Sequence, residues 1–246
     1  MFSIISGTLN RRELLPKLLE NTIFSSSLVE LILVDGGSTD GTIEYLENII
    51  HPNLKLIKYG KRSTYPEFMN LALSHTKYPY IVQWNDDVLL DCTWERVAEE
   101  IEDKYSLYNF PYRQENIDNQ KIGKPHHRSS CMTYPFMLRD YCINFGIYSR
   151  ECIDKIGNYD TRLKWHHGDA QLTACAISNG YKMKLCPEIH VIELYVKKNI
   201  NRKDTPEMNN DQIILKKILI EYGVNTSLYF RYISDRKGLT PYNIND

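Results

Sequence analysis

Residues 28–40 read Leu-Val-Glu-Leu-Ile-Leu-Val-Asp-Gly-Gly-Ser-Thr-Asp, and this stretch decides the fold class. Its first part, 28–34, is nearly all apolar, which is the pattern of a strand buried on both faces of a parallel sheet. Its second part, 35–40, is rich in Gly, Asp and Ser, so it predicts a loop. A helix is expected over about residues 41–50. The stretch therefore predicts one strand-loop-helix unit of an α/β protein.

The same unit recurs on both sides of this stretch. Upstream, residues 2–6 predict a short strand, and residues 11–23 carry Leu and Ile at helical spacing. Asn10 is expected to cap that helix, with Glu13 completing a capping box. Downstream, the pattern predicts strands at 54–58 and 80–84 and a helix at 66–75. This alternation predicts a doubly wound, mostly parallel central sheet flanked by helices.

The second half of the chain is less regular. Residues 111–140 contain Pro, Gly, His and Arg without clear periodicity, so we expect an irregular segment there. A loop of this length in a compact domain is usually functional or mobile. Around it, the pattern predicts helices at about 94–104, 150–157, 169–179 and 209–222, and strands at 106–110, 143–149, 182–186 and 189–195.

Composition excludes several classes of protein. The 246 residues include 30 basic and 31 acidic side chains, a balance that gives no support for nucleic-acid binding. The six Cys form no C-x-x-C pair, and the neighbouring His residues at 126–127 and 166–167 have no Cys or Glu at zinc spacing. The amino terminus lacks the features of a signal peptide, and no apolar run reaches the length of a membrane span. We therefore expect a cytoplasmic protein.

Two adjacent carboxylates, Asp86 and Asp87, end the apolar run that begins at Ile81. A buried carboxylate is costly unless it is paired or bound to a metal, so the pair indicates a hard cation such as Mg²⁺ or Mn²⁺, which commonly bridges to phosphates. The alternative is a polar turn after a strand. In a doubly wound sheet, ligands bind at the carboxyl ends of the strands. The ends marked by Gly7-Thr8, Asp35-Gly36-Gly37 and Asp86-Asp87 should meet at that edge.

Several segments, in this order, resemble the family 2 glycosyltransferases, which have the GT-A fold. They are SIISGTLNR, LILVDGGSTDGT, EFMNLAL, QWNDDV, FGIYSRECIDKIGNYD and HHGDAQLTACAISNGYKM. The chain departs from the family at three positions. Gly7 stands where Pro is usual, Gly36 where a second Asp is common, and Gly168 where a Glu usually precedes Asp169.

The resemblance implies an inverting, metal-dependent enzyme that moves a sugar from a nucleotide-diphosphate sugar, with a UDP-sugar favoured, to a hydroxyl of a glycan or related acceptor. It implies a nucleotide-sugar site made of Thr8, Asn10, Asp35, Gly36, Arg62 and Asp86. It implies Mn²⁺ or Mg²⁺ held by Asp87 and His190, Asp169 as the general base, and sugar or acceptor contacts from Trp165 and His167. Structural roles also stay open: a turn for Asp35, a solvated turn for Arg62, an unliganded histidine at 190, a helix cap for Asp169 and simple packing for Trp165.

The resemblance also suggests a division of the chain. Residues 1–195 would form the GT-A domain, with a nucleotide-binding half at 1–90 and an acceptor and catalytic half at 91–195. Residues 196–246 would form a helical extension packing on that domain, with a lid, a homodimer contact or attachment to a membrane surface as open alternatives. Two other functions also stay open: a sugar nucleotidyltransferase, and a non-catalytic binding module of the same fold that binds a nucleotide sugar or a glycan.

Overall fold

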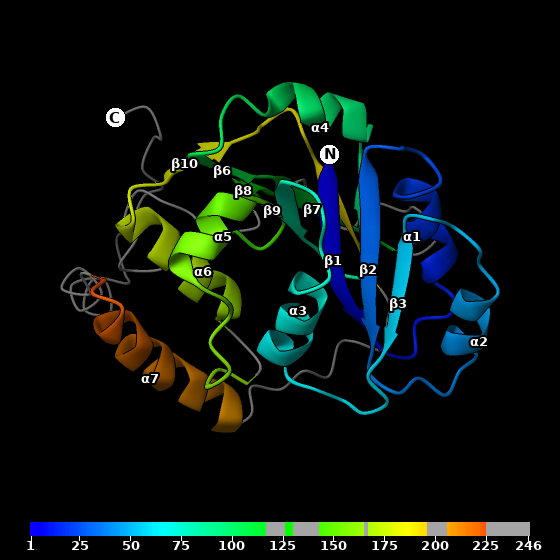
Figure 1. Ribbon diagram of the computed structural model, residues 1–246, viewed down its shortest axis with the longest axis horizontal. Helices are drawn as coiled ribbons and strands as arrows, with labels where there is room; N and C mark the ends of the chain where they lie inside the picture. Colours follow the sequence, from blue (N-terminus) through cyan, green and yellow to red (C-terminus); the bar gives the residue numbers. More distant parts are fainter. Residues whose placement is uncertain (117–125, 130–142, 165–166, 196–205, 225–246) are drawn as a thin grey trace.

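The computed structural model describes residues 1–116, 126–129, 143–164, 167–195 and 206–224. Its main sheet has seven strands, and Figure 1 shows how the helices lie around it. The strand order is β10-β6-β9-β4-β1-β2-β3. The strands are β1 Phe2–Thr8, β2 Val29–Asp35, β3 Leu54–Lys58, β4 Tyr80–Gln83, β6 Ser106–Asn109, β9 Gly146–Ser149 and β10 Lys182–Leu185. All neighbours pair in parallel except β9, which is antiparallel to both β4 and β6. The predicted mostly parallel sheet is confirmed.

Helices cover both faces of this sheet, as Figure 1 shows. The described helices are α1 Leu15–Asn21, α2 Thr42–Glu47, α3 Tyr65–Leu73, α4 Trp94–Glu100, α5 Arg150–Ile156, α6 Gly168–Ser178 and α7 Pro206–Glu221. Strand β2 contributes to two hydrophobic cores because its side chains alternate. Ile32 and Val34 belong to the core that also contains residues of α3, α5, α6 and α7, whereas Leu31 and Leu33 belong to the core that contains residues of α1, α2 and α4. Burial on both faces explains why the segment is almost continuously apolar.

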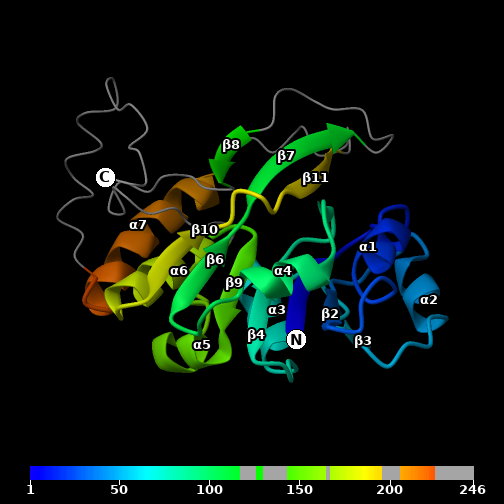
Figure 2. The same cartoon turned by 90° about the horizontal axis from the view of Figure 1, so that it is seen from above.

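A second sheet of four strands, in the order β5-β11-β7-β8, was not predicted (Figure 2). Its strands are β5 Val88–Leu90, β7 Pro111–Asn116, β8 His126–Ser129 and β11 Val191–Tyr195. The prediction that residues 111–140 are irregular is therefore wrong for β7 and β8. The sequence of β7, Pro-Tyr-Arg-Gln-Glu-Asn, has no apolar alternation, and its strand state comes from parallel pairing with β11, some 80 residues away.

The helix predicted at 11–23 begins later, at Leu15, and Asn10 does not cap it. Asn10 has φ 55°, and its side-chain oxygen accepts a hydrogen bond of 2.8 Å from the Thr39 backbone N–H. Its own backbone N–H donates to the Ser38 hydroxyl at 2.8 Å. Asn10 therefore ties the loop after β1 to the loop after β2. This tertiary pairing outweighs the local capping pattern.

The C-terminal helix α7 packs against α6 through Leu215, Ile218 and Leu219, which are all buried. The fully buried Asp211 accepts hydrogen bonds of 3.1 and 3.0 Å from the backbone N–H of Lys164. The segment before α6 is thus attached to α7. The division into a domain and an extension remains a prediction. No described helix has the length and apolar character needed to cross a membrane.

Candidate active site

The carboxyl ends of β1, β2 and β4 lie side by side at one edge of the main sheet. Thr8, at the end of β1, is opposite Asp35, at the end of β2, and the Gly36 N–H donates to the Thr8 carbonyl at 3.0 Å. On the other side of β1, Gln83 ends β4 opposite Ile5. Strand order reverses around β1, because β2 and β3 lie on one side of it and β4 on the other. This is the switch point at which such sheets bind ligands.

Asp35 is fully buried and holds its own loop together. One carboxylate oxygen accepts from the Gly37 and Ser38 backbone N–H groups at 2.8 and 2.9 Å, and the other accepts from the Ser38 hydroxyl. The turn role left open for Asp35 is thus present in the structure. Its contact with a nucleotide remains a prediction. Such a contact is chemically feasible because Oδ2 can accept a second hydrogen bond.

The loop after β3 packs against the loop after β2. A side chain at Gly36 would meet the Arg62 Cα and the Lys61 carbonyl at 3.7 Å. Gly37 has φ +88°, and a Cβ there would lie 2.9 Å from the Gly60 carbonyl oxygen. Glycine is therefore required at 37, and this tight packing brings the exposed Arg62 next to the predicted nucleotide loop.

Asp86 and Asp87 lie where the chain leaves β4 and enters the second sheet. The turn is anchored by the fully buried Trp84, whose indole N–H donates to the Val88 carbonyl at 2.9 Å. The Asp86 side chain is only 11% exposed, and its Oδ1 lies 3.7 Å from Nε of Arg11. Burial raises the pKa of Asp86, against the opposing effects of Arg11 and the Thr8 hydroxyl. Burial, with Asp86 and Glu193 nearby, raises the pKa of Asp87 to about 7.

Neither Arg11 nor Glu193 was predicted as a site residue. Glu193 pairs with Val88 across β11 and β5, which brings it beside Asp87. A lone acidic residue inside the apolar strand predicted at 189–195 was the signal for Glu193. For Arg11 the signal was its position next to Asn10 in the loop that follows β1.

His190 does not lie beside Asp87. Its carbonyl accepts from the Asp91 N–H at 2.8 Å, whereas the Asp87 carbonyl accepts from Leu194 at 2.7 Å. The antiparallel register thus separates His190 from Asp87 by four strand residues, about 13 Å. The pairing of these two as metal ligands stays a prediction, which this register does not favour. The β5–β11 register is not contained in the sequence pattern.

The acidic pair suits a hard divalent cation. Among the described residues, these two largely buried carboxylates share the guanidinium of Arg11, so the pair carries negative charge that a cation would offset. The buried Thr8 hydroxyl, close to Asp86, has no hydrogen-bond partner in the part of the chain that the structure describes. In that part no three His, Cys, Asp or Glu side chains converge as a complete metal cluster. The oxygen donors present match Mg²⁺ or Mn²⁺, which commonly complete their shells with water and substrate phosphates.

Asp169 lies in the first turn of α6, on the segment that follows His167. His167 has φ 70°, and its carbonyl accepts from the Gln171 N–H at 2.9 Å, so it opens the helix. Asp169 is half-buried, and its Oδ1 accepts from the Ala170 N–H at 2.9 Å. Trp165, the other predicted acceptor contact, lies outside the described residues.

Aromatic side chains fill the space at two of the three positions where the chain departs from the family pattern. A Cβ at Gly168 would lie 3.1 Å from the Tyr65 ring and 3.2 Å from the Tyr159 ring. A Cβ at Gly7 would lie 2.7 Å from the Phe68 ring. Tyr65 and Phe68 both belong to the start of α3, which follows the loop that carries Arg62. These contacts place the start of α6 near the same edge as the nucleotide loop.

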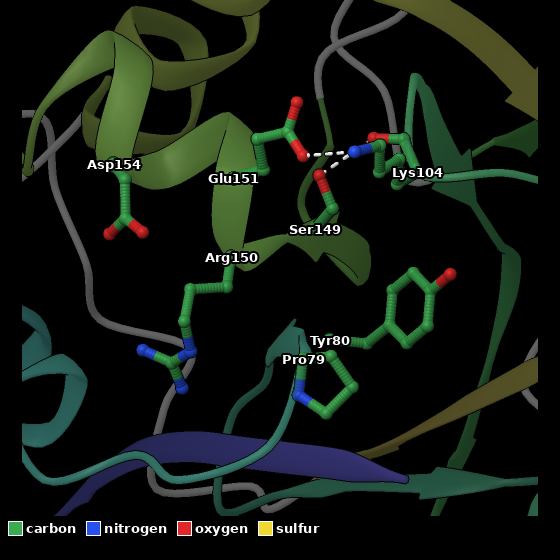
Figure 3. A pocket seen from close by; sticks show the side chains of 7 residues that line it. All are labelled: Pro79, Tyr80, Lys104, Ser149, Arg150, Glu151 and Asp154. Atoms are coloured by element: carbon green, nitrogen blue, oxygen red, sulfur yellow. Dashed lines mark hydrogen bonds and ion pairs between the residues drawn. The ribbon is translucent and has the colours of Figure 1, made fainter.

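A hollow of about 430 Å³ lies elsewhere, at the opposite edge of the sheet (Figure 3). It is lined by residues around Tyr80, which pairs with Phe2 at the amino end of β1. Its basic groups are engaged: Lys104 pairs with Glu151, and Arg150 donates to the Tyr78 carbonyl at 2.7 Å. This hollow is separate from the acidic pair.

A doubly wound sheet with an acidic pair at its switch point, joined to a smaller second sheet, is the architecture of the GT-A fold. The sequence profile of glycosyl transferase family 2 matches residues 3–157, and the chain belongs to that family. It is a glycosyltransferase, as predicted. Comparison with curated proteins finds no match.

Solved structures with this fold are similar over nearly the whole chain. Mannosyltransferase PcManGT from Pyrobaculum calidifontis, in complex with GDP-Man and Mn²⁺, has a TM-score of 0.61 and 16% identity over 98% of this chain and 76% of that one. S. aureus TarS 1–349, in complex with UDP-GlcNAc, has a TM-score of 0.68 and 16% identity over 94% of this chain and 71% of that one. At such identities the similarity establishes the fold alone.

Proposed function

We propose that this glycosyltransferase is metal-dependent, inverts the anomeric configuration and takes a UDP-sugar as its favoured donor. The observation that carries the proposal is the largely buried pair Asp86 and Asp87 at the switch point of the sheet, beside the Arg11 guanidinium. Such a pair suits the cation and diphosphate of a nucleotide sugar. Two structures with the same fold hold nucleotide sugars, GDP-Man with Mn²⁺ in one and UDP-GlcNAc in the other.

The donor would be held at the edge formed by β1, β2 and β4. Thr8 and Asp35 face each other across these strands, and the Thr8 hydroxyl needs a partner that a ligand could supply. Gly36 leaves room for the nucleotide to approach the backbone, and Arg62 lies on the adjoining loop. Asn10 ties this edge together. A Mn²⁺ or Mg²⁺ ion held by Asp87, with Asp86 next to it, would stabilise the charge that develops on the leaving diphosphate.

Sugar transfer would occur in a single displacement. The acceptor oxygen forms a bond to the anomeric carbon while the bond from that carbon to the phosphate oxygen breaks, and the nucleoside diphosphate leaves. Asp169 takes the proton of the acceptor hydroxyl. One displacement inverts the anomeric centre. His167 and Trp165, which precede Asp169 in the chain, would contact the acceptor, a glycan or another molecule with a free hydroxyl.

Calorimetric titration with UDP, GDP and their sugar conjugates, in Mn²⁺ and in EDTA, tests the donor site. We expect one nucleotide to bind with Mn²⁺ and to lose affinity at least about tenfold in EDTA or in Asp87→Asn. Asp91→Asn is the matched control at the far end of β5 and should bind like the wild type. Absence of nucleotide binding in Mn²⁺ would overturn the proposal and favour a non-catalytic glycan-binding module.

The catalytic assignment needs a separate measurement. Asp169→Asn should keep the donor affinity and lose roughly 10²- to 10⁴-fold in kcat, because only the proton acceptor is removed. NMR of the first product formed should show the anomeric configuration opposite to that of the donor. Retention of configuration would exclude a single displacement with Asp169 as the base.

A further inference from the structure

Two adjacent arginines, Arg11 and Arg12, occupy different environments in the loop after β1. The Arg12 guanidinium stacks on the ring of Tyr45, 3.7 Å from its centroid. The Arg11 side chain turns the other way, with its Nε 3.7 Å from Oδ1 of Asp86, and is 20% exposed. Only one of two neighbouring cations therefore faces the acidic pair.

The backbone holds Arg11 in this position. Its N–H donates to the Thr42 hydroxyl at 3.1 Å, and its carbonyl accepts from Leu14 at 2.9 Å and Leu15 at 3.2 Å. The preceding residue, Asn10, is fixed by Ser38 and Thr39. Contacts from α1, α2 and the β2 loop thus fix the base of the side chain, while its charged end lies at the acidic pair.

The separation between Arg11 and Asp86 is too long for a hydrogen bond. Arg11 nonetheless acts on both carboxylates, because its charge opposes the rise that burial causes in the pKa of Asp86 and of Asp87. At 3.7 Å the contact is ionic, so it uses the charge of the guanidinium and leaves its planar N–H donors available for a phosphate.

We propose that Arg11 exchanges partners during the donor-binding cycle. Without a metal it is the counter-ion of the acidic pair, and with the carboxylates neutralised by a divalent cation its N–H donors bind the donor diphosphate. This inference rests on the proposed function, because it needs a cation and a diphosphate at this edge. It predicts opposite effects of one substitution on two ligands. Arg11 should weaken the binding of Mn²⁺ alone and strengthen that of the nucleotide.

The test compares Arg11→Gln with Arg12→Gln, which removes the same charge from the neighbouring residue. Calorimetry would measure Mn²⁺ alone, and then UDP, GDP and the corresponding nucleosides in saturating Mn²⁺. We expect Arg11→Gln to bind Mn²⁺ about threefold or more tightly, since a competing cation is gone, and the nucleoside diphosphate roughly 10- to 100-fold more weakly. Nucleoside binding should stay within about twofold, as should all values for Arg12→Gln.

Each other result has a definite reading. If Arg11→Gln weakens Mn²⁺ and nucleotide together, or changes neither, partner exchange is wrong while the donor site stands. If the wild type binds neither Mn²⁺ nor nucleotide, the proposed function fails and the inference fails with it. Should Arg11→Gln not fold, Arg11→Lys keeps the charge without the planar donors. Arg11→Lys should bind Mn²⁺ like the wild type and lose only nucleotide affinity. If it bound both Mn²⁺ and the nucleotide as tightly as the wild type does, the inference would be overturned.

Discussion

The Tyr159 hydroxyl donates a hydrogen bond of 2.6 Å to Oε1 of Gln83, and both side chains are buried. Gln83 ends β4, three residues before Asp86, and its amide also donates to the carbonyls of Ile143 and Asn144 at 2.9 Å. The Tyr159 ring lies against Gly168, which precedes Asp169. One side-chain pair thus connects the strand that leads to the proposed metal site with the helix that carries the proposed base.

Tyr159→Phe should lower the free energy of unfolding by about 1–3 kcal/mol, because it leaves the buried Gln83 oxygen without its donor. Urea denaturation would measure the loss. Gln83→Met removes the other partner, and the double variant should lose less than the sum of the two single variants. Additive losses would show that the two side chains do not interact energetically. In an activity assay, kcat should fall more than donor affinity.

The pKa of Asp87 predicts how stability depends on pH. Its folded value of about 7 is above the value of an unfolded chain, about 4. The unfolded state therefore ionises first as pH rises, and the wild type should lose stability between about pH 4 and 7, with no further loss from this group above pH 7.

Asp87→Asn should remove most of this pH dependence, and Mn²⁺ should stabilise the wild type more at pH 8 than at pH 5. Thermal denaturation across this range, with and without Mn²⁺, would measure both effects. An unchanged pH profile in Asp87→Asn would contradict the raised pKa. Asp91→Asn, at the other end of β5, is the control and should retain the wild-type profile.

Among the glycines in the part of the chain that the structure describes, Gly146 should be the most costly to replace. A Cβ there would lie 2.2 Å from the Tyr108 carbonyl oxygen, in the middle of the sheet where β9 pairs with β6. Because that oxygen belongs to a strand and cannot move aside, Gly146→Ala should cost about 3 kcal/mol or more. Gly180→Ala is the control: its φ is +89° but nothing lies within 4 Å, so it should cost about 1 kcal/mol. Chemical denaturation of both variants would decide whether β9 and β6 approach this closely.

Two acidic residues of α7 should differ in their contribution to stability. Asp211 is buried and holds the Lys164 backbone N–H, so Asp211→Ala should cost about 1–3 kcal/mol. Glu221 pairs with Arg162 at the surface, where both side chains are about half exposed, and Glu221→Gln should cost no more than about 0.5 kcal/mol. Equal losses in urea denaturation would mean that α7 is not anchored through Asp211. A loss of kcat in Asp211→Ala alone would show that this anchor also positions the segment before Asp169.

Local sequence patterns were sufficient to predict strands and helices whose burial follows from their nearest neighbours in sequence. The continuous apolar run of β2 could only be a strand covered on both faces, and the helices at 65–73 and 168–178 fall close to their predicted positions. The N-terminal cap of the helix predicted at 11–23 could not be predicted from local patterns. The pattern at Asn10 and Glu13 is a good local capping box. In the structure, however, Asn10 donates a hydrogen bond to Ser38 and accepts one from Thr39, almost thirty residues away.

The fold class, the family and the presence of an acidic pair at a strand end could be predicted from the sequence, because each depends on patterns within one segment or on their order. Which side chains surround that pair depends on the tertiary structure. The strand pattern at 189–195 is compatible with registers that bring either His190 or Glu193 near Asp87. Only the pairing of β11 with β5, which sets Glu193 opposite Val88, brings Glu193 there. Likewise, only the folded loop after β1 distinguishes Arg11 from Arg12. A register is set by hydrogen bonds between distant strands, and one residue pattern is compatible with several registers.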